Sequence, residues 1–438
     1  MALYTNTLTT TFANLATTLS SMTANTSITI SDPANVILGA STNSSTLGYI
    51  IKNYTGNYLI DLSPTDLSTA IYLSGNISLF AFCTKLSGIG KLPTTITNGS
   101  QMFYACSNLT FPSNGWQTNI TNAAFMYGNC TSLIGINLMS YNSVISASNM
   151  FQGCYSLEHV VRCNMTTVKY ANYMFEGCKK LKGIDPLDNA LSNNIDTSTF
   201  TSLADACAMF RSCTSITSIN LSGFTKLVNA TDMFQNCTSL AALTNIDSMT
   251  SLINANEMFA NCSSLTTFTL GITSCKITDA SDMLSGCTSL TTVTIADLSS
   301  VDTCSDMFNS DSSLTTVTLP SSIPLATNIS DMFVSCTSLK TIDLSMFTYA
   351  SGIDLEEIFT NCTSLTTVNI GANTAISNNS SLWSLAFAGC TSLTTFNVTT
   401  IDAYNSLLYW TYTHYGITTL DKPITPTLAG NYIYKRIA

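Results

Sequence analysis

The chain has 438 residues, of which 45% are hydrophobic and only 9% are charged, and its formal net charge is −10. The apolar residues suffice for a large core, whereas the acidic balance and the lack of Lys/Arg clusters exclude a nucleic-acid-binding protein, which needs a basic surface. No apolar run of about eighteen residues occurs, so no membrane span is predicted.

Residues 1–75 differ from the rest of the chain and are predicted to form an N-terminal cap or attachment module. The segment FANLATTLSS (12–21) favours a short helix, and Pro64 stands where a second helix would begin. The first residues have neither a basic start nor a continuous apolar stretch, so they do not resemble a signal peptide.

A repeat of mostly 24 or 25 residues dominates residues 76–400. Twelve of the sixteen cysteines fall on one ladder, and Asp311 fills the vacant rung between two of them. The ladder consists of Cys83, Cys106, Cys130, Cys154, Cys178, Cys213, Cys237, Cys262, Cys287, Cys336, Cys362 and Cys390. The step from Cys178 to Cys213 is longer, and KGIDPLDNALSNNIDTST (182–199) is predicted to be a loop insertion there.

Each repeat follows the pattern A-x-x-M-F-x-x-C-x-S-L-x-x-V-x-L, which contains two periodicities. Ala230, Met233, Phe234 and Cys237 are spaced as one face of a short helix, and the acid before Met suits a helix N-terminus. The second half alternates apolar residues with Thr, as a half-buried strand does.

Neither a helix of two turns nor a strand of about five residues is stable alone, so the repeats must stack and cover one another. The sequence therefore predicts an α/β repeat solenoid of about thirteen coils, with a parallel sheet on one face and short helices on the other. Asp311 is expected at a helix end, with its carboxylate hydrogen-bonded or in contact with water.

The repeated M-F-x-x-C-x-S-L unit resembles the BspA-like leucine-rich-repeat family over roughly residues 76–400. Members of that family are mostly surface proteins of bacteria and some protists, and related repeats occur in phage and prophage proteins. The resemblance therefore implies a leucine-rich-repeat array that serves adhesion rather than catalysis.

The strand positions expected to face outward form rows of Thr, Asp and Asn. These binding-face candidates are Thr267, Thr269, Thr292, Thr294, Thr316, Thr318, Thr341, Asp343, Thr367, Asn369, Thr395 and Asn397. Strand propensity and solubility account for such rows. A face that binds glycan or protein is the functional interpretation, and a regular threonine array for binding ice is a third.

Residues 401–438 are rich in aromatic residues and are predicted to form a C-terminal cap. Tyr and Trp are also favoured binding anchors, so this segment is alternatively a contact surface or subunit interface. Its contact candidates are Tyr409, Trp410, Tyr412 and Tyr415.

The sequence predicts neither an enzyme nor a metal or cofactor site. The two histidines, His159 and His414, have no recognisable catalytic partners, and the ladder supplies one cysteine per coil rather than paired zinc ligands. Reduced, buried thiols are expected, although neighbouring rungs are close enough for disulfides and Cys163 is a candidate for exposure. The acids around Asp354 are interpreted as a solvated helix N-terminus rather than a calcium site.

These observations predict a non-enzymatic binding or structural protein. The first hypothesis is a virion protein of tail-fibre or surface type, assembled without a signal peptide, whose partners are a host-surface glycan or protein or other virion subunits. The alternative is a bacterial or protist cell-surface adhesin. Both place the protein on a virion or an extracellular surface, and homo-oligomerisation stays open.

Overall fold

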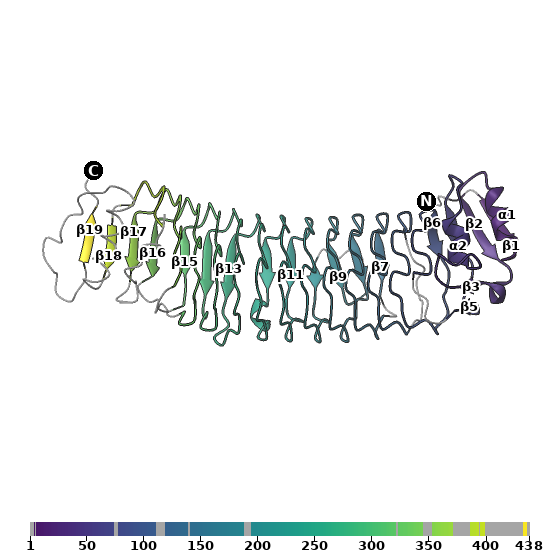
Figure 1. The fold of residues 1–438 in the computed structure, drawn as a ribbon, viewed down its shortest axis with the longest axis horizontal. Coiled ribbons are helices and arrows are strands. Elements are labelled where there is room, and N and C mark those ends of the chain that lie inside the picture. The colour runs from purple at the N-terminus through teal and green to yellow at the C-terminus, as the bar shows by residue number, and fades with distance from the viewer. Residues whose placement is uncertain are drawn as a thin grey trace. The chain divides into compact units, whose positions relative to one another are not determined.

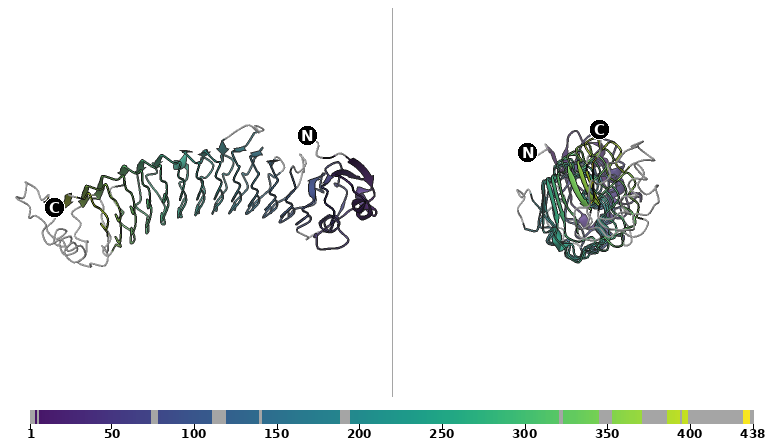
Figure 2. Two further views of the ribbon diagram at one scale, coloured as in Figure 1. Left: turned by 90° about the horizontal axis from the view of Figure 1, so that it is seen from above. Right: turned by 90° about the vertical axis from the view of Figure 1, so that its left-hand side faces the viewer.

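The computed structural model describes residues 4, 6–73, 78–110, 119–138, 141–187, 194–320, 323–344, 353–370, 386–393, 395–398 and 432–435. The chain divides into two compact units, Met1–Leu227 and Val228–Ala438. Both are built from stacked coils whose strands lie side by side within the unit (Figure 1 and Figure 2). The chain is a parallel β-solenoid of about fourteen turns, which confirms the solenoid prediction of about thirteen coils.

The first part of unit 1 contains the α-helices found among the described residues. Its elements are β1 (Asn6–Thr10), α1 (Leu15–Ser20), β2 (Thr26–Ile30), the 3-10 helix η1 (Pro33–Asn35), β3 (Ile37–Leu38), α2 (Leu47–Lys52), β4 (Ile60–Leu62), β5 (Ile71–Tyr72) and β6 (Leu86–Ile89). The expected helix over 12–21 is present as α1, whereas the helix expected at Pro64 is not formed. Instead α2 begins earlier, where the Thr46 side chain accepts a hydrogen bond from the Tyr49 N–H.

Two parallel sheets organise this region. One has the strand order β1-β2-β4-β6, and the other pairs β3 with β5. Because β6 belongs to the first repeat, the sheet of the N-terminal region is continuous with the first coil in the same unit.

The remaining strands of unit 1 form a parallel ladder. They are β7 (Gly135–Asn137), β8 (His159–Val161), β9 (Gly183–Asp185), β10 (Ile195–Asp196) and β11 (Ser218–Asn220). The segment predicted to be only a loop insertion contributes strands, because Ile195 of β10 pairs with both Ile184 and Ile219. Phe175 and Phe210 nevertheless stack directly, at 5.4 Å between ring centroids. The insertion therefore adds a strand to the sheet without separating the two turns opposite it.

Unit 2 holds the most regular strands of the chain. They are β12 (Ala242–Thr244), η2 (Ile246–Ser248, a 3-10 helix), β13 (Thr267–Leu270), β14 (Thr292–Ile295), β15 (Thr316–Thr318), β16 (Thr341–Leu344), β17 (Thr367–Ile370), β18 (Thr395–Val398) and β19 (Tyr432–Lys435). The strands β13-β14-β15 form one parallel sheet. The strands β16-β17-β18 form another, on which β19 closes the edge antiparallel.

The short helices predicted opposite the sheet are wrong: the segment from Ala to Cys forms successive turns. In the coil 230–237, Asp232 and Asn236 have φ values of 56° and 62°, which a right-handed helix does not allow. The Cys237 N–H donates to the Phe234 carbonyl three residues back, at 3.0 Å. The Phe234 N–H donates across to the Met258 carbonyl of the next coil, at 2.8 Å. Some backbone N–H groups of the turn therefore bond within their own coil, and others bond to the next coil.

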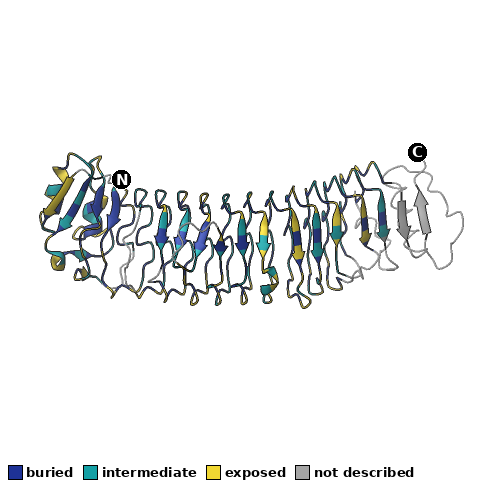
Figure 3. Cartoon of the chain, turned by 180° about the vertical axis from the view of Figure 1, so that it is seen from behind, coloured by how far each residue is buried: buried dark blue, intermediate teal, exposed yellow. Residues whose placement is uncertain are grey.

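The interior of each unit is built from equivalent residues of successive coils, and the described Met, Phe, Cys and Leu positions of the repeat are buried (Figure 3). The aromatic rings of Phe80, Phe103, Tyr127, Phe151, Phe175 and Phe210 form a continuous stack in unit 1, with consecutive centroids 5.4 to 5.5 Å apart. Offset stacking at this spacing adds favourable contact to the burial of each ring.

The cysteine ladder consists of thiols, as expected, and Cys163 is buried rather than exposed. On most rungs the Sγ donates to a backbone carbonyl of the preceding coil. Cys154 donates to Tyr127 at 3.1 Å, and Cys336 donates to Phe308 at 3.1 Å. A buried S–H is thus hydrogen-bonded as well as packed.

The expectation for Asp311 is wrong. The residue is 0% exposed, and neither carboxyl oxygen has a hydrogen-bond partner. It occupies the rung where a cysteine would lie, inside the solenoid, because the turn that carries it points this position inward. Burial raises the pKa of its carboxyl well above the usual range.

Candidate functional site

The outward rows of the first sheet of unit 2 have the geometry that the sequence predicts. Thr267 pairs in register with Thr292, and Thr292 pairs with Thr316. The second row consists of Thr269, Thr294 and Thr318. Along β13 exposed threonines alternate with the buried Phe268 and Leu270. Two parallel rows of hydroxyl-bearing side chains therefore lie on the outer face of this sheet.

The second sheet of unit 2 continues the pattern with different chemistry. Thr341 pairs with Thr367, and Asp343 pairs with Asn369, which places a carboxylate beside an amide. Thr341 and Asp343 are exposed. Thr395 and Asn397 follow in register through their backbone, but their side chains lie outside the described residues.

Threonines next to these rows have a different task. Thr291 Oγ1 donates to the Thr266 carbonyl at 3.0 Å, and Thr315 Oγ1 donates to the Thr291 carbonyl at 3.1 Å. These hydroxyls tie neighbouring coils together. Among the described residues, no such side-chain bond is formed by the hydroxyls of the two outward rows. The outward hydroxyls can therefore hydrogen-bond to water or to a partner.

A row of acids runs along the turns of unit 2 and was predicted only as helix-terminal charge. This acidic row consists of Asp232, Glu257, Asp282, Asp306, Asp331 and Glu357, one residue per coil, each with a positive φ. Burial, followed by the neighbouring charges, raises the pKa of Asp282 and of Asp331 to about 6. The acids repel one another at neutral pH.

The acids at 354–357 form part of a turn. The Asp354 carboxylate accepts a hydrogen bond from the Glu356 N–H at 3.0 Å, which is an Asx-type turn. Over the described ranges, no group of three or more His, Cys, Asp or Glu side chains is placed to hold a metal ion. In the same part of the chain no helix is both long enough and apolar enough to cross a membrane.

The structure describes one of the two histidines, His159. His159 lies on β8, and its Nδ1 atom is buried without a hydrogen-bond partner. His414 and the contact candidates Tyr409, Trp410, Tyr412 and Tyr415 lie outside the described residues.

Two family descriptions match the chain. Residues 192–305, 282–409 and 357–435 match a family described as BspA type Leucine rich repeat region (6 copies). Residues 78–185 match a family described as Mycoplasma protein of unknown function, DUF285. No curated protein matches the sequence.

Solved structures with a similar fold include bacterial repeat proteins. A leucine-rich repeat protein from Bacteroides ovatus is 20% identical, over 71% of this chain and 82% of that one, with a TM-score of 0.39. A leucine rich cell surface protein from Faecalibacterium prausnitzii is 18% identical, over 74% of this chain and 86% of that one, with a TM-score of 0.31. At these values neither likeness bears on function.

Proposed function

The chain belongs to the BspA-type leucine-rich-repeat family, and from that premise we propose that it is a non-enzymatic binding protein whose outer sheet face contacts its partner. Leucine-rich-repeat solenoids are typically non-enzymatic binding proteins, and they commonly bind protein or ligand partners. The observation that carries the proposal is the pair of hydroxyl rows over β13, β14 and β15.

The partner class follows from the chemistry of these rows. Their six threonines are uncharged, stand in register, and are not used to tie the coils together. The hydroxyls of such a face can form hydrogen bonds with the hydroxyl or amide groups of a neutral partner. The threonine methyl groups can contact the apolar parts of that partner. We therefore propose a host-surface glycan or protein as the partner.

The test places two positive charges on the centre of the face. The double variant Thr292→Arg/Thr294→Arg should bind its target surface at least about tenfold more weakly, because long charged side chains would cover the hydroxyl rows. The matched control is Thr288→Arg/Ser289→Arg, which places the same charges on exposed residues of the same coil outside the strand. Binding of the full chain to host cells and to arrays of glycans and matrix proteins is the measurement. Equal binding by both variants contradicts the proposal.

We also propose a setting outside the producing cell. This proposal is supported by the composition: only 9% of residues are charged, and the hydroxyl and amide groups of Thr, Ser and Asn hydrate the surface instead. A virion of tail-fibre or surface type is the first setting, and a bacterial or protist cell surface is the alternative. Antibodies against the chain should label purified virus particles in the first case and intact cells in the second.

Ice is a third partner for threonine rows, and it is favoured by the register of the T-x-T pairs on β13, β14 and β15. The carboxylate of Asp343 and the amide of Asn369 interrupt the regular array on the next sheet. Thermal hysteresis of a solution of the full chain would support ice binding. A solution at millimolar concentration that shows no thermal hysteresis would exclude ice binding.

A further inference from the structure

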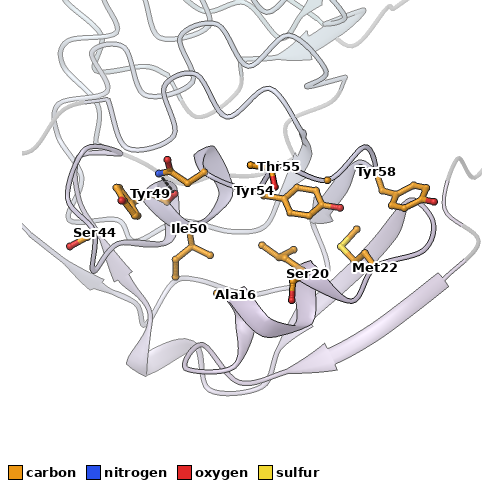
Figure 4. A pocket seen from close by; sticks show the side chains of 12 residues that line it. Ala16, Ser20, Met22, Ser44, Tyr49, Ile50, Tyr54, Thr55 and Tyr58 are labelled. Carbon is orange, nitrogen blue, oxygen red and sulfur yellow. Dashed lines mark hydrogen bonds between the residues drawn. The ribbon is translucent and has the colours of Figure 1, made fainter.

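A cavity of about 530 Å³ lies in the N-terminal region of unit 1, between α1 and the segment that runs from α2 to β4 (Figure 4). No sequence motif marks it, because its walls come from residues 16–22 and from residues 44–58. Its volume falls within the range of small-molecule sites, about 300–1,000 Å³. The cavity is separate from the sheet face of unit 2 and stands independently of the function proposed for that face.

The lining combines aromatic rings with neutral polar groups. Leu19 and Met22 are buried, while the rings of Tyr49, Tyr54 and Tyr58 contribute further apolar surface. The small polar residues of the lining are Ser20, Ser44, Asn53 and Thr55. None of the twelve lining residues is Asp, Glu, Lys, Arg or His.

The place of the Tyr54 ring depends on Gly56. A Cβ atom added at residue 56 would lie 2.1 Å from the Tyr54 Oη and 2.2 Å from its Cζ. Glycine at this position lets the ring fold back over the backbone and into the lining (Figure 4). The side chain of Asn53 is held in turn, because its Nδ2 donates to the Tyr49 carbonyl at 2.9 Å.

We propose that this cavity binds a neutral saccharide of one or two rings. A sugar ring has apolar C–H faces, which pack against aromatic rings, and an equatorial set of hydroxyls, which bond to hydroxyl and amide groups. The cavity offers both kinds of surface. No charged side chain lines the cavity, so a charged ligand would find no opposite charge there, and the lining favours a neutral one.

The probes are maltose, cellobiose, lactose and N,N′-diacetylchitobiose, titrated into the full chain and followed by calorimetry and saturation-transfer NMR. Sialyllactose and a proline-rich peptide serve as the charged and peptidic comparators, since aromatic-lined grooves also take proline-rich segments. At least one neutral disaccharide should bind with a dissociation constant in the millimolar range or tighter. Binding of the comparators alone overturns the proposal, as does binding of nothing.

Two variants locate the binding. Ala16→Trp fills the cavity from an exposed helix position and should weaken binding at least about tenfold, whereas its exposed neighbour Thr17→Trp, which does not line the cavity, should leave binding intact. Gly56→Ala displaces the Tyr54 ring from the other side and should also weaken binding. If neither Ala16→Trp nor Gly56→Ala changes the affinity, the sugar binds elsewhere and the proposal fails. Thr292→Arg/Thr294→Arg should not affect this binding, which keeps the two proposals distinguishable.

Discussion

Asp311 is the residue at which the repeat departs furthest from its own pattern. It stands between the thiols of Cys287 and Cys336 on the buried ladder, and its two carboxyl oxygens have no partner. A charged carboxylate there would be unsolvated and uncompensated. The pKa is raised by burial, so the carboxyl keeps its proton in the folded state.

Replacing this acid by the cysteine of the other rungs should stabilise the chain. Below about pH 4 the acid is protonated whether folded or unfolded, so the two proteins differ least there. As the pH rises, only the unfolded chain loses the proton, and the wild type loses about 1.4 kcal/mol per pH unit until the folded pKa is reached. The stability advantage of Asp311→Cys should therefore grow from pH 4 to pH 7.

Urea denaturation at pH 4, 5.5 and 7 measures this advantage. Asp311→Asn is the control, since it keeps the shape and polarity but cannot ionise, and its advantage over wild type should grow in the same way. An advantage that is constant with pH would show that Asp311 does not titrate abnormally.

The acidic row makes a second pH-dependent contribution to the free energy of unfolding, and this contribution also falls as the pH rises. Burial and the charges of Asp306 and Glu257 raise the pKa of Asp282 to about 6, and Asp331 behaves alike. Since a raised carboxyl pKa favours folding at low pH, stability falls as the pH rises from about 4 to about 6. Asp282→Asn and Asp331→Asn should each remove part of this fall, below about 1 kcal/mol, because both residues are only half-buried and solvent screens part of the effect.

Thermal melts between pH 4.5 and 7.5 test the row. Asp302→Asn removes a negative charge at an exposed position outside the row, and it controls for net charge. If Asp302→Asn flattens the pH dependence as much as Asp282→Asn does, net charge rather than the row is responsible.

At the scale of the element, the turn replaces the helix as the unit opposite the sheet. The spacing of Ala230, Met233, Phe234 and Cys237 fits one helix face, yet successive turns with left-handed residues bury the same positions. The left-handed positions are occupied mostly by Asn, Asp, Gly and Ser, of which Gly, Asn and Asp adopt positive φ most readily. The apolar spacing alone could not distinguish a short helix from these turns, because both conformations point the same side chains inward.

The aromatic stack inside these turns should be a main source of stability. Phe333 stacks on Phe308 at 5.3 Å and on Phe359 at 5.5 Å. Phe333→Ala should lower the free energy of unfolding by about 3–5 kcal/mol, whereas Phe333→Leu should lower it much less, because Leu284 already fills the equivalent place in its own coil. Chemical denaturation followed by circular dichroism compares the two variants, and equal losses would contradict this prediction by showing that an aliphatic side chain cannot replace the ring at this position.

Over the whole molecule, burial keeps the thiols unreactive. Fifteen of the sixteen cysteines are buried, and Cys207 is half-buried. Burial raises the pKa of Cys154 to about 12, and the reactive thiolate is therefore scarce along the ladder. Titration of the native chain with a thiol reagent should label Cys207 first, and all sixteen should react in urea. Fast native labelling of several ladder cysteines would contradict the buried arrangement.

The sequence by itself determined the period, the strand half of each coil, the inward rows of Met, Phe, Cys and Leu, and the outward threonines, because these are contained in a single repeat. Only the tertiary structure decided which carbonyl each N–H of the turn meets, which threonine hydroxyls join the coils, that Asp311 lacks a partner, and that tyrosines gather around a cavity. The reason is physical: each of these depends on atoms from another coil or segment, usually more than twenty residues away, and no local pattern records where those atoms lie.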